Sequence, residues 1–288
     1  MKGWVNSIKL RLPMRIDAHQ HFWNHDPVRH AWIDESMSRI RRDFSPGDLA
    51  PLLHELAIDG TIAVQADETM EETSFLLGLA QKNDFIKAVV GWVDFNQGDI
   101  HETLASLKSN TKLAGFRCIM QGKPDELYLR NTEFIQKLKL LKALDFSYDL
   151  LVYHDQMGSL LHFVEKLPEN RLILDHIGKP DIKSGNIKEW KDHIRILAQH
   201  PGIYCKISGM ITEAKYHDWN YDQLIPYMET VAEYFGMDRI CFGSDWPVCL
   251  VAGNYKQVYD VVDRFSMQLS TEEKRKLFGL NAKDFYKC

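Results

Sequence analysis

The stretch MRIDAHQH, residues 14–21, is a short apolar run that leads directly into two histidines, and seven similar runs follow it along the chain. Short runs rich in branched and aromatic side chains, bounded by turn residues, predict buried strands. The eight predicted strands cover residues 14–17, 60–64, 88–93, 113–117, 147–153, 171–175, 203–207 and 239–242.

Longer segments with apolar residues at helical spacing separate these strands. They cover residues 48–58, 73–81, 100–107, 133–144, 157–166, 187–198, 221–235 and 255–264. Helix-start residues support several of them: Ser45 and Pro46 precede the first, Asp155 precedes the fifth, and the run STEE at 270–273 begins a final one.

Strands that alternate with helices pair in parallel through right-handed crossovers. Eight such units predict a (β/α)8 barrel, whereas an open doubly wound sheet more often has about five to seven strands. No GxGxxG motif follows the first strand, which argues against a dinucleotide-binding sheet. We therefore predict a single (β/α)8 barrel, an α/β fold.

The length of 288 residues suits one such barrel, which commonly uses about 250 residues. Apolar residues make up 45% of the chain and charged residues 26%, as in ordinary globular proteins. No repeat, low-complexity tract or Pro/Gly-rich linker divides the sequence. We predict a short extension over residues 1–13 and a single domain over residues 14–288.

Charge argues against a nucleic acid partner, and the distribution of apolar residues argues against a membrane partner. The formal net charge is −5, and the densest basic cluster (Arg39, Arg41 and Arg42) is short and flanked by acidic residues. Binding to a phosphate backbone requires a basic stripe. No run of 18 apolar residues is present, so no membrane span is predicted.

The cysteines predict a reducing compartment. Their number is odd and no CxxC pair occurs, which is typical of free thiols in the cytoplasm. The five are Cys118, Cys205, Cys241, Cys249 and Cys288. We predict a cytoplasmic protein with a small-molecule partner, and the sequence leaves open whether it forms a homo-oligomer.

Polar residues stand where predicted strands end, and in a barrel of this kind chemistry occurs at the carboxyl ends of the strands. His19 and His21 end the first strand, and alternation with period two points them the same way. Asp245 follows the eighth strand, which barrel closure places beside the first. His176 follows the sixth strand and His154 follows the fifth.

Each of these residues alone has a structural alternative. A histidine pair can be hydrogen-bonded within the fold, and Asp245 can cap the turn that follows its strand. Three histidine-bearing strand ends and one aspartate-bearing strand end at the same rim favour a catalytic site over chance. An aspartate beside imidazoles or a metal stays ionised and can take a proton from water.

Further strand ends carry residues that could hold a polar ligand. Gln65 follows the second strand and Arg117 ends the fourth. Trp23, Trp92 and Trp246 lie near the same rim and could stack on the apolar face of a sugar, although core packing explains each tryptophan equally well. We predict these five residues and His154 as substrate-binding residues.

Six motifs in this order resemble the amidohydrolase superfamily, in the branch called amidohydrolase 2. That branch includes lactonases for sugar acids of the fuconolactone and rhamnonolactone type, 2-pyrone-4,6-dicarboxylate lactonase and some decarboxylases. The resemblance covers nearly the whole chain from residue 14 and implies the metal-dependent-hydrolase type of (β/α)8 barrel. The motifs are IDAHQHFW (16–23), GWVD (91–94), GFR (115–117), LDHIGKP (174–180), KISG (206–209) and GSDWP (243–247).

The resemblance implies that His19, His21, His176 and Asp245 are the catalytic residues. It implies one divalent metal, zinc, held by His19, His21 and Asp245, with His154 as a weaker candidate ligand. No lysine stands at the ends of the fourth and fifth predicted strands, so a two-metal site is not expected. Some lactonases of the branch work without metal, so both a zinc enzyme and a metal-independent one stay open.

The sequence therefore predicts a lactonase, a hydrolase of carbohydrate metabolism that opens an aldonolactone to the aldonic acid with a water activated by Asp245. The alternative on the same scaffold is a metal-dependent decarboxylase or other lyase. Two further alternatives are a non-catalytic binding protein, and a sugar-phosphate isomerase or aldolase, which would need a Gly-rich phosphate loop after the seventh and eighth strands.

Overall fold

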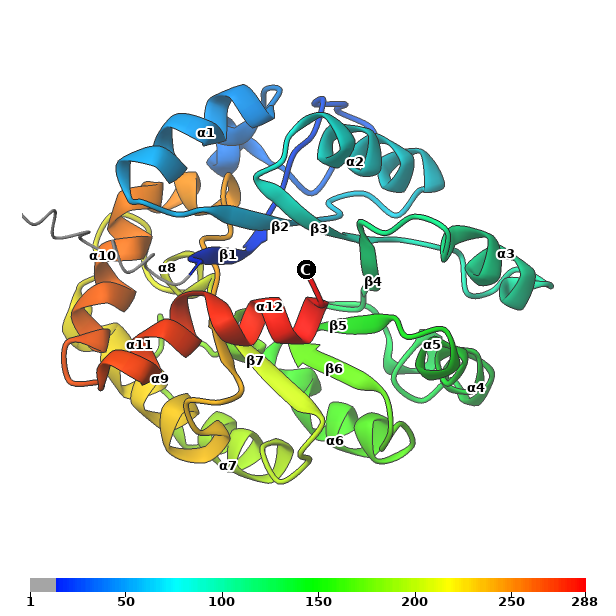
Figure 1. Cartoon of the computed structure of the whole chain (residues 1–288). Coiled ribbons are helices and arrows are strands. Elements are labelled where there is room, and N and C mark those ends of the chain that lie inside the picture. The colour runs from blue at the N-terminus through cyan, green and yellow to red at the C-terminus, as the bar shows by residue number, and fades with distance from the viewer. Residues whose placement is uncertain (1–13) are drawn as a thin grey trace, which may run out of the picture.

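The computed structural model describes residues 14–288 and places eight parallel strands in a ring that helices surround (Figure 1). The strands pair in chain order, each parallel to its neighbour, which confirms the predicted (β/α)8 barrel. The predicted extension, 1–13, lies outside the described residues. The strands are β1 (Ile16–Gln20), β2 (Gly60–Val64), β3 (Ile86–Gly91), β4 (Leu113–Ile119), β5 (Ser147–Leu151), β6 (Arg171–Leu174), β7 (Ile203–Ile207) and β8 (Ile240–Phe242).

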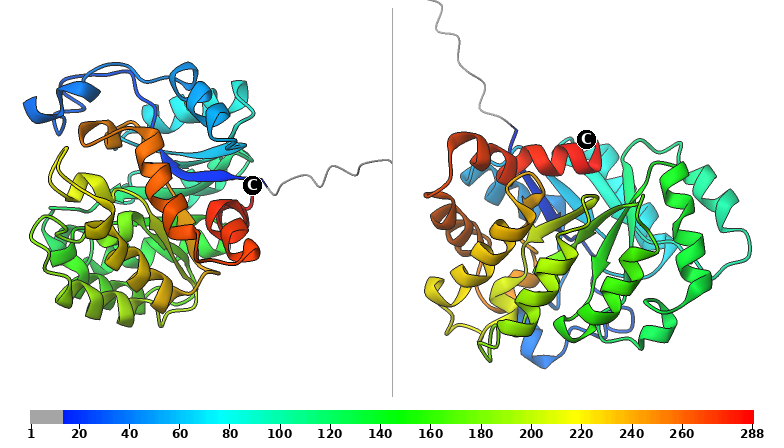
Figure 2. Two further views of the ribbon diagram at one scale, coloured as in Figure 1. Left: turned by 90° about the vertical axis from the view of Figure 1, so that its left-hand side faces the viewer. Right: turned by 90° about the horizontal axis from the view of Figure 1, so that it is seen from below.

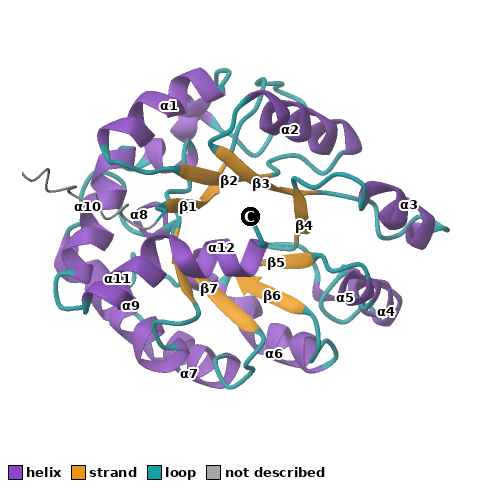
Figure 3. Ribbon diagram, viewed as in Figure 1, coloured by secondary structure: helices purple, strands orange, loops and turns teal. Residues whose placement is uncertain are grey.

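An outer layer of helices covers the ring (Figure 3). Its main members are α1 (Pro46–Glu55), α2 (Met70–Lys82), α3 (Ile100–Leu107), α4 (Thr132–Leu138), α5 (Leu140–Ala143), α6 (Met157–Glu165), α7 (Lys188–Leu197), α9 (Tyr221–Phe235) and α10 (Tyr255–Ser266). Shorter helices follow β7 and close the described chain, namely α8 (Met210–Glu213), α11 (Thr271–Arg275) and α12 (Asn281–Tyr286).

Two helix starts behave as predicted and one does not. The Asp48 carboxylate accepts from the backbone N–H and the hydroxyl of Ser45 at the start of α1, and Ser270 caps α11. Asp155 is not a cap, because a 3-10 turn over His154–Gln156 intervenes and α6 begins at Met157. The predicted helix over 133–144 is divided into α4 and α5, and the short helix α8 was not predicted.

The barrel closes between β1 and β8. A parallel bridge joins Gln20 to Trp246, and the backbone N–H of His21 donates to the Trp246 carbonyl at 2.7 Å. The N–H of Asp245 donates to the carbonyl of His19 at 2.8 Å. This closure brings together residues that are more than 220 positions apart in the sequence.

Helix α12 covers the end of the barrel where the strands begin, opposite the carboxyl ends (Figure 2). Its residues Phe285 and Tyr286 pack in one apolar cluster with side chains of β1, β2, β3, β6 and β8. The preceding turn touches the start of β1, since a Cβ on Gly279 would lie 2.0 Å from the Met14 carbonyl oxygen. One end of the barrel is thus closed by packing, which leaves the carboxyl ends for a site.

No helix within residues 14–288 is long and apolar enough to span a bilayer. All five cysteines are unpaired, and four of them are buried. Burial raises the pKa of the Cys118 and Cys241 thiols to about 12, so these thiols stay protonated and unreactive.

The packing of β4 against β5 can be tested at Gly115, whose Cα lies close to the backbone of Ser147. It pairs with Ser147 between β4 and β5, and a Cβ there would lie 2.6 Å from the Ser147 carbonyl oxygen. Because a backbone atom cannot move aside cheaply, Gly115→Ala is expected to lower the free energy of unfolding by about 2 kcal/mol or more, measured by urea denaturation.

Gly78→Ala is the matched control. It lies inside α2 with nothing within 4 Å of the added methyl, and it should raise stability by about 0.5–1 kcal/mol. Equal effects at the two sites would contradict the packing described.

Candidate active site

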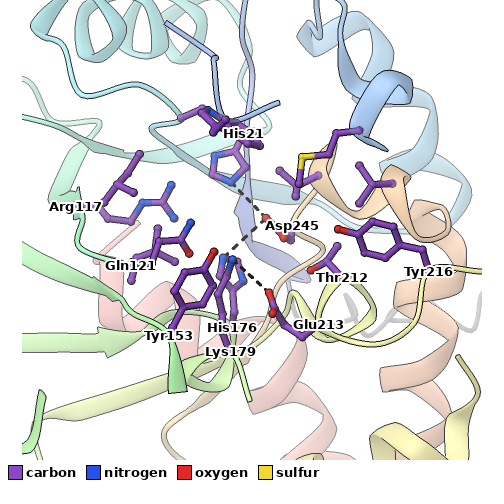
Figure 4. Close-up of a pocket in the computed structure, with 17 residues that line it drawn as sticks. His21, Arg117, Gln121, Tyr153, His176, Lys179, Thr212, Glu213, Tyr216 and Asp245 are labelled. Atoms are coloured by element: carbon purple, nitrogen blue, oxygen red, sulfur yellow. Dashed lines mark ion pairs between the residues drawn. The ribbon is translucent and has the colours of Figure 1, made fainter. Parts of the chain in front are cut away.

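A cavity of about 310 Å³ lies at the carboxyl ends of the strands (Figure 4). Four of the predicted site residues line it: His21, Arg117, His176 and Asp245. His19 lies beneath them and is fully buried. Barrel closure therefore gathers the four predicted catalytic residues in one place, at the end of the barrel where sequence reasoning expected them.

Asp245 stands at the centre of the histidines. Its Oδ1 lies 3.4 Å from His21 Nε2 and 3.9 Å from the Nε2 atoms of both His19 and His176. Burial disfavours its charge, but His176, His21 and His19 outweigh burial and hold the pKa of Asp245 well below its usual range. Burial lowers the pKa of His176 to about 4. At neutral pH the site thus holds a carboxylate facing a neutral imidazole, an arrangement suited to accept a proton from water.

The backbone fixes the orientation of His21. Its Nδ1 lies 2.7 Å from the carbonyl oxygen of Val64, which can only accept, so Nδ1 carries the hydrogen. The lone pair on Nε2 then faces Asp245 Oδ1 at 3.4 Å. Because the lone pairs of this nitrogen and this oxygen repel each other, a proton or a cation between the two atoms would stabilise the arrangement. A backbone carbonyl behind the imidazole is the usual partner of a histidine that ligates a metal.

The distances among the donor atoms test whether a metal fits. His19, His21 and Asp245 offer two nitrogens and one oxygen that all lie within 4.8 Å of one another. Two ligand atoms on one tetrahedral zinc lie about 3.3–3.4 Å apart. The Nε2 atoms of His19 and His21 are 3.2 Å apart, His21 Nε2 is 3.4 Å from Asp245 Oδ1, and His19 Nε2 is 3.9 Å from the same oxygen. Two of the three distances match the zinc spacing and the third exceeds it by about 0.5 Å, which a small rotation of one side chain closes, so these residues are able to hold a single zinc ion. Among the described residues, His154 is in neither this group nor the other group of potential ligands, His19, Asp175 and His176.

A buried charge network supports His19 from below. Lys206 on β7 is fully buried, and its ammonium lies 2.5 Å from Asp149 Oδ2, 2.9 Å from Asp175 Oδ1 and 3.1 Å from His19 Nδ1. Tyr286 of α12 donates its hydroxyl to Asp149 at 2.8 Å. Burial raises the pKa of Asp149 to about 6. The network connects the closed end of the barrel to the catalytic histidines.

Arg117 on β4 lines the cavity, but its guanidinium is already engaged. One nitrogen donates to Asp175 Oδ2 at 2.9 Å, and the other donates to the carbonyl of Gln65 at 2.5 Å. Burial opposes the charge of Asp175, yet Lys206, His19 and Arg117 lower the pKa of this carboxyl well below its usual range. The charge of Arg117 is thus neutralised by the protein itself.

The chain after β6 turns in the left-handed region to present His176. His176, Ile177 and Lys179 have φ of 53°, 50° and 45°, a conformation that costs residues with a Cβ about 1–2 kcal/mol each. The imidazole packs on Gly209 after β7, where a Cβ would lie 2.6 Å from Nδ1 of His176. The same nitrogen lies 2.9 Å from the hydroxyl of Ser208. Strain of this kind is typical of functional sites.

The other residues predicted to bind substrate do not line this cavity. Gln65 is buried and donates to the Arg117 carbonyl at 3.0 Å, and Trp23 and Trp246 are buried in the core. Trp92 packs against the core from the outside, and His154 lies in the turn after β5. Their assignment to substrate binding stays a prediction.

Several lining residues were missed by sequence reasoning. Lys179 is part of the motif LDHIGKP, which does not show that its side chain faces the cavity, and Glu213 ends a helix too short to show a helical period. Trp32, Tyr153 and Tyr216 supply aromatic side chains at the mouth of the cavity, each 36–39% exposed. The available signal was their position shortly after predicted strands, which many other polar and aromatic residues share.

Comparison with known proteins places the chain among characterised relatives. It is 35% identical over 283 residues to an L-fucono-1,5-lactonase of Burkholderia ambifaria, with 96% of each chain covered. It is 36% identical to an L-fucono-1,5-lactonase of Burkholderia multivorans, with 95% of this chain and 96% of the relative covered. An L-rhamnono-gamma-lactonase of Scheffersomyces stipitis is 24% identical over 70% of this chain and 69% of its own length.

Solved structures agree with these similarities. A crystal structure of an amidohydrolase from Burkholderia multivorans with bound zinc has a TM-score of 0.91 and 36% identity, and the match covers 95% of this chain and 99% of that one. The family pattern described as Amidohydrolase matches residues 16–288, nearly the whole chain. Taken with a barrel that gathers His19, His21, His176 and Asp245 at one end, this match shows that the chain belongs to the amidohydrolase 2 family.

Proposed function

We propose that this protein is a lactonase that opens a sugar-acid lactone, of the L-fuconolactone or L-rhamnonolactone type, to the aldonic acid. The observation that carries the proposal is the carboxylate of Asp245, which lines a cavity with His21 and His176 and lies 3.4 Å and 3.9 Å from their Nε2 atoms. The names and identities of the relatives support this substrate class. The low pKa of Asp245 keeps its carboxylate ionised, and therefore able to accept a proton, over the physiological pH range.

In the proposed reaction, a water molecule beside Asp245 attacks the lactone carbonyl carbon and Asp245 takes its proton. His176 is neutral, and the Ser208 hydroxyl can donate to its Nδ1, which leaves the Nε2 hydrogen to donate to the carbonyl oxygen. A donor aimed at the developing oxyanion stabilises the tetrahedral intermediate. When the intermediate collapses, the bond from the carbonyl carbon to the ring oxygen breaks, and Asp245 returns its proton to that oxygen.

A zinc ion held by His19, His21 and Asp245 would polarise the carbonyl and lower the pKa of water towards about 7. The hydrogen bond from His21 Nδ1 to Val64 keeps the ligand nitrogen of this ring directed at the same point. Arg117 lines the cavity beside these residues, and its guanidinium is held in place by Asp175 and the Gln65 carbonyl.

A panel of lactones tests the proposed function. We expect acid release from one or more of L-fucono-, L-rhamnono- and D-galactonolactone, measured with a pH indicator, and no release of CO2 from aromatic or sugar carboxylic acids. CO2 release without lactone opening would contradict the proposal and favour the decarboxylase alternative. Parallel assays with a chelator separate a zinc enzyme from a metal-independent one.

Replacement of Asp245 tests its role as the base. Asp245→Asn keeps the shape of the side chain, and asparagine tolerates the left-handed φ of 56° at this position. We expect kcat to fall by about 10³-fold or more with an unchanged thermal midpoint, because an amide cannot take the proton. Asp94→Asn is the matched control: its carboxylate accepts only from the Asn96 backbone, and activity should be retained. Near-normal activity in Asp245→Asn would remove this residue from the proposed role.

Metal content provides a test that does not depend on activity. We expect about one zinc per chain by elemental analysis, and a loss of bound zinc in His21→Ala because one of the three ligands is removed. His54→Ala, an exposed histidine in α1, should keep the zinc of the unchanged protein. Equal zinc in both variants would show that the metal binds elsewhere.

A further inference from the structure

An ion pair stands in the wall of the cavity, next to the catalytic residues. Lys179, from the turn after β6, lies 3.3 Å from Oε1 of Glu213, at the end of α8 (Figure 4). Both side chains line the cavity with Asp245 and His176, and they are 15% and 20% exposed. The proposed mechanism uses neither residue.

Backbone hydrogen bonds fix the positions of both Lys179 and Glu213. Lys179 follows His176 by three residues in the left-handed turn, and its N–H donates to the His176 carbonyl at 2.8 Å. The N–H of Lys183 donates to the carbonyl of Glu213 at 3.1 Å, which ties α8 to the segment that carries Lys179. The same strained turn that presents His176 thus presents the ammonium of Lys179.

The ion pair between Lys179 and Glu213 affects whether the cavity favours a charged or a neutral substrate. Among the described residues that line it, the permanent cations are Arg117 and Lys179, and each already has a carboxylate partner, Asp175 and Glu213 respectively. A substrate carboxylate would therefore find both cations of the cavity wall already paired, so these side chains favour a neutral substrate.

The pair keeps capacity for hydrogen bonds to such a substrate. An ammonium has three N–H donors and a carboxylate has about four acceptor sites, so one contact between them leaves both open to further partners. Each hydroxyl group of a sugar both donates and accepts. The Tyr153 ring lies 5.2 Å from the Lys179 ammonium, and with Trp32 and Tyr216 it gives the mouth an aromatic surface for the C–H face of a sugar ring.

We propose that Lys179 and Glu213 together bind adjacent hydroxyl groups of an uncharged, polyhydroxylated lactone and exclude carboxylated lactones. This inference rests on the proposed lactonase function and adds the residues that select the substrate. Lys179 donates to one hydroxyl oxygen, and Glu213 accepts from the neighbouring hydroxyl. A lactone that lacks these hydroxyl groups would leave the ammonium and the carboxylate without hydrogen-bond partners. Because an unpaired buried polar group is costly, such a site is strongly selective for the hydroxylated lactone.

The test measures kcat/KM for three lactones: L-fuconolactone, δ-valerolactone, which has no hydroxyl groups, and 2-pyrone-4,6-dicarboxylate. In Glu213→Gln and Lys179→Met we expect the preference for L-fuconolactone over δ-valerolactone to fall about 10- to 100-fold. In Glu213→Gln the ammonium of Lys179 becomes uncompensated, so the preference for the dicarboxylate over L-fuconolactone should rise by about 10-fold or more. A purely structural role for Glu213 would not produce this gain.

Lys123→Met is the matched control, since Lys123 forms an ion pair with Glu68 and does not line the cavity. Its selectivity should equal that of the unchanged protein. Equal losses for L-fuconolactone and δ-valerolactone in the Lys179 and Glu213 variants, or no rise in dicarboxylate preference in Glu213→Gln, would overturn the inference alone. Failure of the unchanged protein to open L-fucono-, L-rhamnono- and D-galactonolactone would instead overturn the proposed function, and the inference with it.

Discussion

The burial of the Lys206 ammonium beneath the histidines is the constraint on which the rest of the site depends. An unpaired charge in a barrel interior costs several kcal/mol, and Lys206 is stable there because Asp149 and Asp175 face it from β5 and β6. The same ammonium reaches His19 on β1. Charge compensation therefore fixes the relative positions of four strands, and it fixes His19, to which the other catalytic residues lie close.

The sequence was sufficient to predict the barrel and which residues meet at its carboxyl end. The common location of His19, His21, His176 and Asp245 was predictable because strands repeat with period two and because all carboxyl ends meet at one rim, so position at a strand end determines position in space. Glu213 was missed for the opposite reason. It belongs to a four-residue helix whose placement depends on a hydrogen bond to Lys183, a contact that leaves no pattern in the sequence.

The aromatic residues show the same difference between strand and loop. Trp23 and Trp246 were predicted at the rim from their distance to strand ends, yet both rings turn into the core, where Trp23 donates to the Arg42 carbonyl at 2.8 Å. The aromatic side chains at the mouth come from the segments after β1, β5 and β7, namely Trp32, Tyr153 and Tyr216. The direction of a loop side chain depends on tertiary packing, which spacing alone does not encode.

The junction between β1 and β8 has a consequence for how the protein loses activity. β1 and β8 meet through one bridge and a few backbone hydrogen bonds, whereas each of the other strand pairs forms a ladder of three or more paired residues. Asp245 and His21 face each other across this junction. Heating that loosens the junction would separate base from imidazole while the other seven ladders and the outer helices persist. Inactivation would then precede the loss of helical circular dichroism, and the enzyme's own turnover would serve as the most sensitive reporter of barrel opening.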